Sequence, residues 1–479
     1  MRTRIFSLLI SSLLLGCQPK KAEVDMGSKI AIPEVAAAVD FIPEMPSIFQ
    51  NTEGLNIWLV ENHQLPVVVM QIVLPGGASS DPVGQSGQAE LVAQMLLQSV
   101  GDSDATALSS TELSKAFYQQ AAEITIDVQR RQTIIEIAAH KDRLDAILPL
   151  VQKMIFEPQF LESDWNRVVE RHRNSVQQVR EDARAISSNY AGYFLYGEDH
   201  PLGRLTDGTP ASLGKIDREA AQKWHQSRLR LQDSALVVVG ALNQERVNTL
   251  STQYFNAWSS ESQLFEQPQF GEVTPKTGIY LVDMPGAEQT AIRVFSPAYE
   301  RNSEDAIAAH LASVAMGGSF TSRLNALLRE EKGYTYGAGC SFVEGYYGNF
   351  FVAQTSVQID VTAAALTDMF MVLDTAKEGF SEDELKKSLS SFKAEFVDLG
   401  ASRSNYASEL VDLWAMGLEA TSLSEDLQQS NGITVDDLQK VSQYFDRNRG
   451  IVLLVGDASV VLPQLREANF SVTQVELPE

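Results

Sequence analysis

Candidate metal ligands and nucleophiles are few in this chain and widely spaced. No two histidines lie within 20 residues of each other, so none can pair on one helical face as metal ligands do. Glu90 and Gln94 are four residues apart and could hold a hard cation weakly, but such a polar pair is usually a solvated helix face. Cys340 is a thiol without an evident histidine partner. We therefore predict no metal site in this chain. The six histidines are His63, His140, His172, His200, His225 and His310.

The element that carries Glu90 and Gln94 has the pattern of an amphipathic helix. The stretch 87–100 reads GQAELVAQMLLQSV. Its apolar residues recur at helical spacing and predict a stripe that faces the core. That stripe consists of Val92, Met95, Leu96 and Val100.

The chain contains an internal repeat. The segment 54–61 and the apolar strand 67–74 match the segments 278–283 and 290–295, with Leu59 falling on Leu281 at an offset of 222 (281 − 59). Near the end of each half, Val239-Gly240 falls on Val455-Gly456 at an offset of 216 (455 − 239). Consistent order and spacing favour a duplicated domain of about 220 residues over a chance match of short strands.

Within each half, strand patterns come first, then long helical patterns, then strands again. We expect helices over 144–155 and 163–179, and paired strands over 123–128 and 133–138. This order predicts an α+β fold of two tandem homologous domains, each a mostly antiparallel sheet packed with helices. The predicted segments are 1–16 (signal peptide), 17–45 (tether), 46–258 (N-terminal domain), 259–275 (linker) and 276–479 (C-terminal domain).

The first residues resemble a lipoprotein signal peptide. A basic start and a short apolar run end in Leu14-Leu15-Gly16-Cys17, similar to a bacterial lipobox with Cys17 as the lipid attachment site. The apolar run is shorter than the roughly 20 residues needed to span a bilayer. Gln18, rather than Asp, follows the cysteine, which by resemblance favours the periplasmic side of the outer membrane of a Gram-negative bacterium. A net charge of −24 argues against nucleic-acid binding and against electrostatic docking on anionic lipid.

The two halves together resemble the pitrilysin/insulinase family of zinc metallopeptidases. In the first half the resemblance rests on Gly76-Gly77-Ala78-Ser79, Asp81, Gly87-Gln88-Ala89 and His200-Pro201-Leu202-Gly203. In the second half it rests on the segments 317–324 (GGSFTSRL) and 328–336 (LREEKGYTY). The resemblance covers nearly the whole chain after the signal peptide, and the second-half motif is its most specific part.

The resemblance implies a zinc site whose ligands this chain has changed. Active members carry H-x-x-E-H on the helix that follows the Gly-x-Ala opening, with two histidine ligands and a glutamate base. These positions are Glu90, Ala93 and Gln94 here, and the third ligand, a glutamate some 80 residues on, falls near Asn174 or Ser175. We therefore interpret the helix as a catalytic helix whose chemistry has been lost.

The resemblance also implies one retained function. Family members use an arginine and a tyrosine seven residues apart to orient the substrate backbone and stabilise the oxyanion, and Arg329 and Tyr336 have this spacing. A guanidinium and a phenol suit a carbonyl oxygen that gains negative charge. By this reading Gly333 ends a helix, Arg329 lies in its last turn and Tyr336 lies on the next strand.

Three functions remain open from the sequence. The first is a non-catalytic, lipid-anchored subunit of a heterodimeric periplasmic zinc peptidase, in which a homologous partner carries zinc and the complex cleaves unfolded peptides. The second is a scaffold or peptide-binding lipoprotein without a peptidase role. A self-sufficient enzyme of altered chemistry, built on Cys340, is poorly supported. We expect no cofactor in this chain and zinc only in the partner.

Overall fold

The structure is a computed structural model that describes residues 40–101, 107–229, 233–256, 275–299, 303–343 and 349–479. The predicted signal peptide, with Cys17, lies outside the described residues, as do most of the predicted tether and all but the last residue of the predicted linker. The predicted domain boundaries therefore stay predictions.

The first half contains a six-stranded sheet in the order β1-β2-β6-β3-β5-β4. β2 and β6 are parallel, and the other neighbouring pairs are antiparallel. β3 (VVVMQIVLP) is buried over almost its whole length, which suits its β-branched and aliphatic residues. The bounds are β1 (Ser47–Gln50), β2 (Asn56–Glu61), β3 (Val67–Pro75), β4 (Glu123–Val128), β5 (Gln132–His140) and β6 (Ala235–Gly240).

The second half repeats five of these strands in the order β12-β7-β11-β8-β10-β9, and only its outer strand β12, which follows β11 and is parallel to β7, differs from β1. β7 starts 222 residues after β2 (278 − 56), and β11 starts 216 residues after β6 (451 − 235), which are the two offsets found in the sequence. The prediction of an α+β fold with mostly antiparallel sheets and helices is confirmed. The bounds are β7 (Gly278–Asp283), β8 (Gln289–Pro297), β9 (Ala338–Val343), β10 (Phe350–Gln358), β11 (Ile451–Gly456) and β12 (Val472–Val475).

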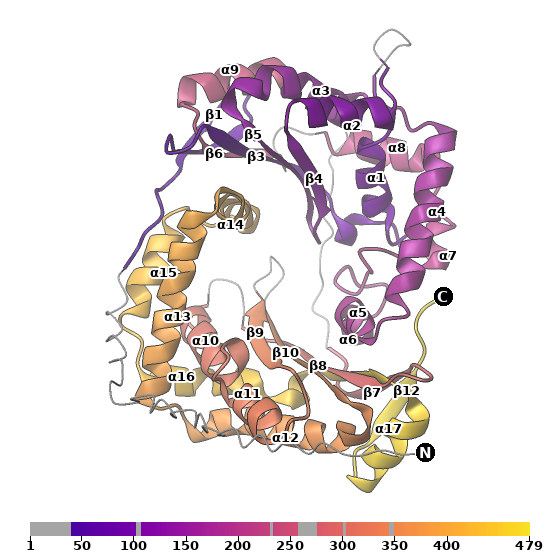
Figure 1. Ribbon diagram of the computed structural model, residues 1–479, viewed down its shortest axis with the longest axis vertical. Coiled ribbons are helices and arrows are strands. Elements are labelled where there is room, and N and C mark those ends of the chain that lie inside the picture. The colour runs from indigo at the N-terminus through magenta and orange to yellow at the C-terminus, as the bar shows by residue number, and fades with distance from the viewer. Residues whose placement is uncertain (1–39, 102–106, 230–232, 257–274, 300–302, 344–348) are drawn as a thin grey trace, which may run out of the picture. The chain divides into compact units, whose positions relative to one another are not determined.

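Helices accompany each sheet (Figure 1). The helices predicted over 144–155 and 163–179 are α3 (Leu144–Phe156) and α4 (Glu162–Val179). The other first-half helices are α1 (Gln88–Leu96), α2 (Ser110–Gln119), α5 (Ala183–Asn189), α6 (Ala191–Tyr196), α7 (Pro210–Leu213), α8 (Arg218–Ser227) and α9 (Gln244–Tyr254). Those of the second half are α10 (Ala306–Ser313), η4 (Val314–Gly318), α11 (Arg323–Asn325), η5 (Ala326–Glu331), α12 (Thr362–Asp374), η7 (Thr375–Glu378), α13 (Glu382–Ala401), α14 (Arg403–Met416), α15 (Ser422–Ser430), α16 (Val435–Lys440), η8 (Val441–Phe445) and α17 (Ala458–Glu467).

Each half sends helices onto the sheet of the other half. α14 packs on β3 and β6 of the first sheet, and α5 and α6 pack on β8 and β11 of the second. The first contact includes a polar link, in which Gln71 donates to Ser408 Oγ (2.9 Å) and Ser404 donates to Glu136 (3.0 Å). This exchange, which the sequence pattern did not predict, covers the second apolar face of each central sheet and fixes the two halves to each other.

Candidate functional site

The helix α1 begins where its sequence predicts, on a buried carboxylate. Asp81 accepts hydrogen bonds from the backbone N–H groups of Gly87 (2.7 Å), Gln88 (3.1 Å) and Ala89 (2.9 Å). Burial raises the pKa of Asp81 to about 7, although these three donors favour its charged form. Gly87 has φ +93°, and a Cβ there would lie 2.9 Å from the Asp207 carbonyl oxygen. A glycine at position 87 is thus required by the backbone, independently of catalysis.

Gln94 joins the substituted zinc-motif face to α4. Its amide nitrogen donates to Glu90 Oε1 (2.9 Å) and contacts His172 Nδ1 (3.0 Å), and its amide oxygen accepts from Arg171 (3.0 Å). The other ring nitrogen of His172, Nε2, lies 2.9 Å from the Asp207 carbonyl oxygen. A neutral ring that donates from Nε2 and accepts at Nδ1 satisfies both contacts. Side-chain hydrogen bonds therefore link α1 and α4 at the positions where the resemblance predicted zinc ligands.

The remaining positions of the motif fit the same interpretation. Burial raises the pKa of Glu90, while the hydrogen bond from the Gln94 amide favours its charged form. Ala93, at the position of the general base, is 3% exposed and packs with Ala89 and Val128. No carboxylate is present there to activate a water molecule. Among the described residues, no three His, Cys, Asp or Glu side chains form a group that could hold a metal ion.

The α4 residues that contact Gln94 are Arg171 and His172. Asn174 and Ser175, the positions predicted for the third ligand, are exposed. Sequence reasoning missed His172 because it compared the histidines only with one another. The signal was the spacing, since His172 lies 78 residues after Gln94, close to the family's interval of some 80.

Arg329 lies at the end of a helical segment, as predicted. It is in the last turn of η5, and Gly333, with φ +66°, follows in the left-handed conformation that ends the segment. Its guanidinium stacks on the Phe320 ring with its carbon 4.1 Å from the ring centroid, and its Nε lies 3.3 Å from Glu330. About a third of the side chain (34%) is exposed. Arg329 is thus oriented by its neighbours but accessible to a ligand.

Tyr336 differs from its prediction in one respect. It does not lie on a strand: it lies in a bend two residues before β9 begins at Ala338. Gly337 follows it, and the backbone between Thr335 and Gly337 is held by the Thr335 hydroxyl, which bonds the Gly337 N–H and carbonyl oxygen. The bend leaves Tyr336 90% exposed.

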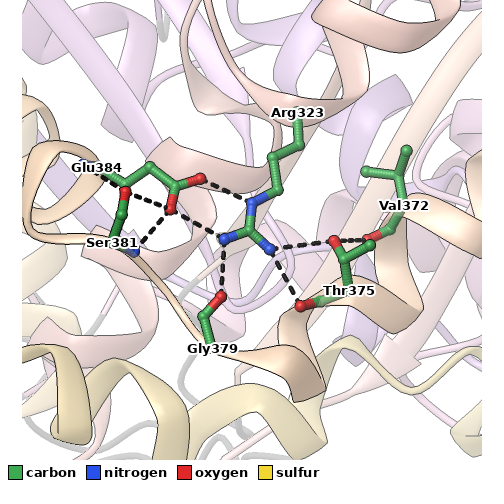
Figure 2. A network of polar contacts seen from close by, with 6 residues as sticks. All are labelled: Arg323, Val372, Thr375, Gly379, Ser381 and Glu384. Carbon is green, nitrogen blue, oxygen red and sulfur yellow. Dashed lines mark hydrogen bonds and ion pairs between the residues drawn. The ribbon is translucent and has the colours of Figure 1, made fainter.

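A second arginine fixes the segment that carries this pair (Figure 2). Arg323 donates to both carboxylate oxygens of Glu384 (2.7 and 2.9 Å), to the Gly379 carbonyl oxygen (2.8 Å), and to the carbonyl and hydroxyl oxygens of Thr375 (3.0 Å each). These five contacts use the donor capacity of a guanidinium fully. Arg323 therefore anchors the start of α11 to η7 and α13, and η5 follows α11 directly.

Cys340 is a packing residue. It is 5% exposed, its Sγ lies 3.7 Å from the Ser313 carbonyl oxygen, and burial raises the pKa of its thiol. A buried neutral thiol is a poor nucleophile, which disfavours an enzyme built on it. None of the helices in the described ranges is long and apolar enough to cross a membrane.

The chain is similar to peptidases in sequence. Residues 215–392 match the model of the peptidase M16 inactive domain. An uncharacterized zinc protease of Mycobacterium leprae is 24% identical over 282 residues, which cover 54% of this chain and 59% of that protein. An uncharacterized zinc protease of Mycobacterium tuberculosis is 24% identical over 283 residues, which cover 54% of this chain and 60% of that protein. The chain thus spans about 60% of the length of these relatives.

Solved structures share the fold. A peptidase M16 inactive domain from Pseudomonas fluorescens has a TM-score of 0.78 at 19% identity and covers 90% of this chain and 100% of its own. A protease from Helicobacter pylori has a TM-score of 0.77 at 19% identity, and the match covers 86% of this chain and 100% of that chain. A chain of complex III2 from Candida albicans has a TM-score of 0.69 at 13% identity, and the match covers 89% of this chain and 100% of that chain.

The family model, the zinc-protease relatives and the shared fold agree with the motifs on both halves. The chain is similar to the pitrilysin/insulinase family and fits a non-catalytic member of it, in which the sequence resemblance puts Glu90, Ala93 and Gln94 at the H-x-x-E-H positions.

Proposed function

We propose that this chain is the non-catalytic, lipid-anchored subunit of a heterodimeric periplasmic zinc peptidase. Its partner is a homologous subunit with an intact H-x-x-E-H motif, and the substrates are unfolded peptides. The observation that carries the proposal is the accessibility of Arg329 and Tyr336, whose side chains are 34% and 90% exposed. Large polar side chains displayed in this way stabilise the chain's own fold little, which is consistent with a role toward a ligand held elsewhere.

In the proposed complex, zinc in the partner would polarise the scissile carbonyl and activate water. The Arg329 guanidinium and the Tyr336 hydroxyl would donate hydrogen bonds to the carbonyl oxygen as it gains negative charge. Phe320 holds the guanidinium by stacking before the substrate arrives, which lowers the entropy lost on binding.

Reconstitution tests this proposal. The purified chain alone should contain no stoichiometric zinc by elemental analysis and should not cleave an unfolded peptide. Adding it to a zinc-bearing homologue from the same organism should produce peptide turnover that rises to a plateau at a 1:1 ratio. Turnover that is the same with and without this chain would contradict the role of a subunit.

The lipid anchor is a proposal with its own test. A surface with a net charge of −24 is repelled by anionic lipid, so acylation of Cys17 would supply the membrane attachment. Cys17→Ser should release a soluble periplasmic protein or leave an unprocessed precursor. A processed Cys17→Ser chain that still fractionates with the outer membrane would refute the lipoprotein assignment.

The second candidate function is a scaffold or peptide-binding lipoprotein with no peptidase partner. The shared fold with a chain of complex III2 is consistent with it, since that chain belongs to an assembly of another kind. The two candidates differ in the reconstitution experiment, because a scaffold leaves the turnover of every zinc-bearing homologue unchanged.

A further inference from the structure

The side chain of Asn325 is buried at the point where α11 ends and η5 begins. The residue is 8% exposed, and its amide makes three hydrogen bonds. Nδ2 donates to the Ser319 carbonyl oxygen (3.0 Å) and to Ser322 Oγ (3.3 Å), and Oδ1 accepts from the Ala338 N–H (3.0 Å). A backbone N–H can only donate and a carbonyl oxygen can only accept, so the amide satisfies both groups in one orientation. An aspartate in its place could not donate to Ser319.

The donor side of this amide holds the turn that carries Phe320. Ser319 directly precedes Phe320, and its carbonyl oxygen accepts from the Ser322 N–H (3.1 Å) as well as from Asn325 (3.0 Å). The Phe320 ring is 62% exposed, so packing fixes it little and its position depends on the backbone of the turn. Arg329 stacks on this ring with its guanidinium carbon 4.1 Å from the centroid. The Asn325 amide therefore supports the ring that supports Arg329.

The acceptor side of the amide holds the end of the bend that carries Tyr336. Ala338, whose N–H the amide oxygen accepts, lies two residues after Tyr336 and begins β9. The start of the bend is tied to η5, since the Tyr334 N–H donates to the Leu328 carbonyl oxygen (2.9 Å). Tyr336 lies between these two fixed points and is 90% exposed, so the backbone, rather than packing, decides where its hydroxyl lies.

Both supports therefore meet at one side chain. η5, which carries Arg329, follows Asn325 directly in the chain. Loss of the amide would free the Phe320 turn and the Tyr336 bend at the same time, while the guanidinium and the phenol both stay present. Groups that act on a reacting carbonyl tolerate little movement, since a misplacement of about 1 Å can cost about 10²-fold in rate.

We propose that Asn325 is a positioning residue for the Arg329–Tyr336 pair. Its amide sets the relative position of the guanidinium and the phenol before the substrate arrives, and it does not contact the substrate. The inference rests on the proposed function for the reaction that the pair serves. Its structural part, that Asn325 holds the Tyr336 bend, requires no partner subunit.

Turnover of the mixed complex with the zinc-bearing homologue tests the positioning role. Asn325→Ala should lower kcat at least about tenfold and change KM less than about twofold, because the amide acts on the pair and not on the bound peptide. Asn325→Asp keeps the volume and the acceptor but loses both donors, and it should lower kcat at least about fivefold. The aspartate variant keeps the test valid if the alanine variant does not fold. Wild-type kcat in either folded variant overturns the proposal.

Asn51→Ala is the matched control, because Asn51 is a buried asparagine of the first half with equivalent hydrogen bonds. It is 5% exposed, donates to Ser251 Oγ (3.3 Å) and accepts from the Glu53 and Leu55 N–H groups (3.0 and 2.9 Å). Its loss should lower the urea midpoint of unfolding by a similar amount and leave kcat at the wild-type value. An equal loss of kcat in both variants would assign the effect of Asn325 to lost stability and overturn the proposal.

A double-mutant cycle shows whether Asn325 acts through the pair. In the Tyr336→Phe background, the further loss of kcat caused by Asn325→Ala should be at least about threefold smaller than in the wild type, since the hydroxyl that Asn325 positions is already absent. A loss in the double variant that equals the product of the two separate losses overturns the proposal.

Hydrogen exchange on the chain alone tests the structural part. In Asn325→Ala the backbone amide of Ala338 should exchange at least about tenfold faster than in the wild type, because it loses its acceptor. In Asn51→Ala the same amide should exchange at the wild-type rate. Unchanged exchange at Ala338 in Asn325→Ala would overturn the inference.

These measurements separate the inference from the proposed function. If the wild-type chain activates no zinc-bearing homologue, the proposed subunit role is refuted, and exchange at Ala338 decides whether Asn325 holds the bend. If the wild-type chain activates the homologue and Asn325→Ala keeps wild-type kcat, the subunit role stands and only the positioning role is refuted.

Discussion

Two polar regions of this chain use their side chains in opposite ways. On the α1–α4 face, the Gln94 amide contacts Glu90, His172 and Arg171, so its donors and its acceptor are used inside the fold. Among the described residues, Arg329 at the end of η5 is held only by the Phe320 ring and the neighbouring Glu330 carboxylate, and Tyr336 is 90% exposed. The first region has become a structural contact between two helices, whereas the second keeps groups that can act on something outside the fold.

The same contrast holds between two arginines six residues apart. All five contacts of Arg323 are to residues of its own half, and its side chain is 22% exposed, while Arg329 is 34% exposed. Arg323 thus supports the segment on which Arg329 is displayed. The predictions below test this division of roles, in order of decreasing effect on stability.

Arg323→Met should be the most destabilising change. It leaves the Glu384 carboxylate and two backbone carbonyls without their guanidinium, and we expect a loss of about 2–4 kcal/mol in the free energy of unfolding. Arg329→Met, which breaks no buried contact, should change it by less than about 0.5 kcal/mol. Urea unfolding of both variants, with unchanged m-values, measures the difference. Equal losses would show that Arg329 is structural too.

Gln94→Leu should cost less, about 1–3 kcal/mol, because Glu90, Arg171 and His172 each lose a hydrogen-bonding partner at a partly solvated face. Gln119→Leu, at an exposed position of α2, is the matched control and should be nearly neutral. If the two variants unfold at the same urea concentration, the α1–α4 network contributes nothing to stability.

Because of the Glu384 carboxylate, the free energy of unfolding should depend slightly on pH in the acid range. Burial opposes its charge, but hydrogen bonds from Arg323 and Ser381 lower its pKa to about 2. Because the folded pKa lies below the unfolded value of about 4.3, its stabilisation is present above that value and is lost as the pH falls toward 2. Between about pH 5 and pH 3 the free energy of unfolding of the wild type should fall by roughly 1 kcal/mol more than that of Glu384→Gln. This figure includes a reduction because solvent screens the partly exposed Glu384 carboxylate. Parallel pH profiles for the two proteins would contradict this.

The fold was more predictable from the sequence than the site was. Strands of the same pattern recurred at 222 and 216 residues, and Gly333 marked the end of the helix that carries Arg329, because both signals are local. The Gln94–His172 contact was missed because it joins residues 78 apart through the packing of α1 on α4. The exchange of α5, α6 and α14 between the halves was missed for the same reason. Tyr336 was assigned to a strand because its residue type suits one, whereas Gly337 and the Thr335 hydroxyl hold a bend there.

The turnover of the mixed complex tests the central claim most directly. With the zinc-bearing homologue and saturating peptide, Arg329→Ala and Tyr336→Phe should each lower kcat by about 10²–10³, the cost of removing one oxyanion donor. Assembly should be intact by size-exclusion chromatography. Lys332→Ala is the matched control, since Lys332 follows the same helical segment with a side chain 36% exposed, and it should leave kcat unchanged. Wild-type turnover by both the Arg329 and Tyr336 variants would contradict the account and assign the pair to structure.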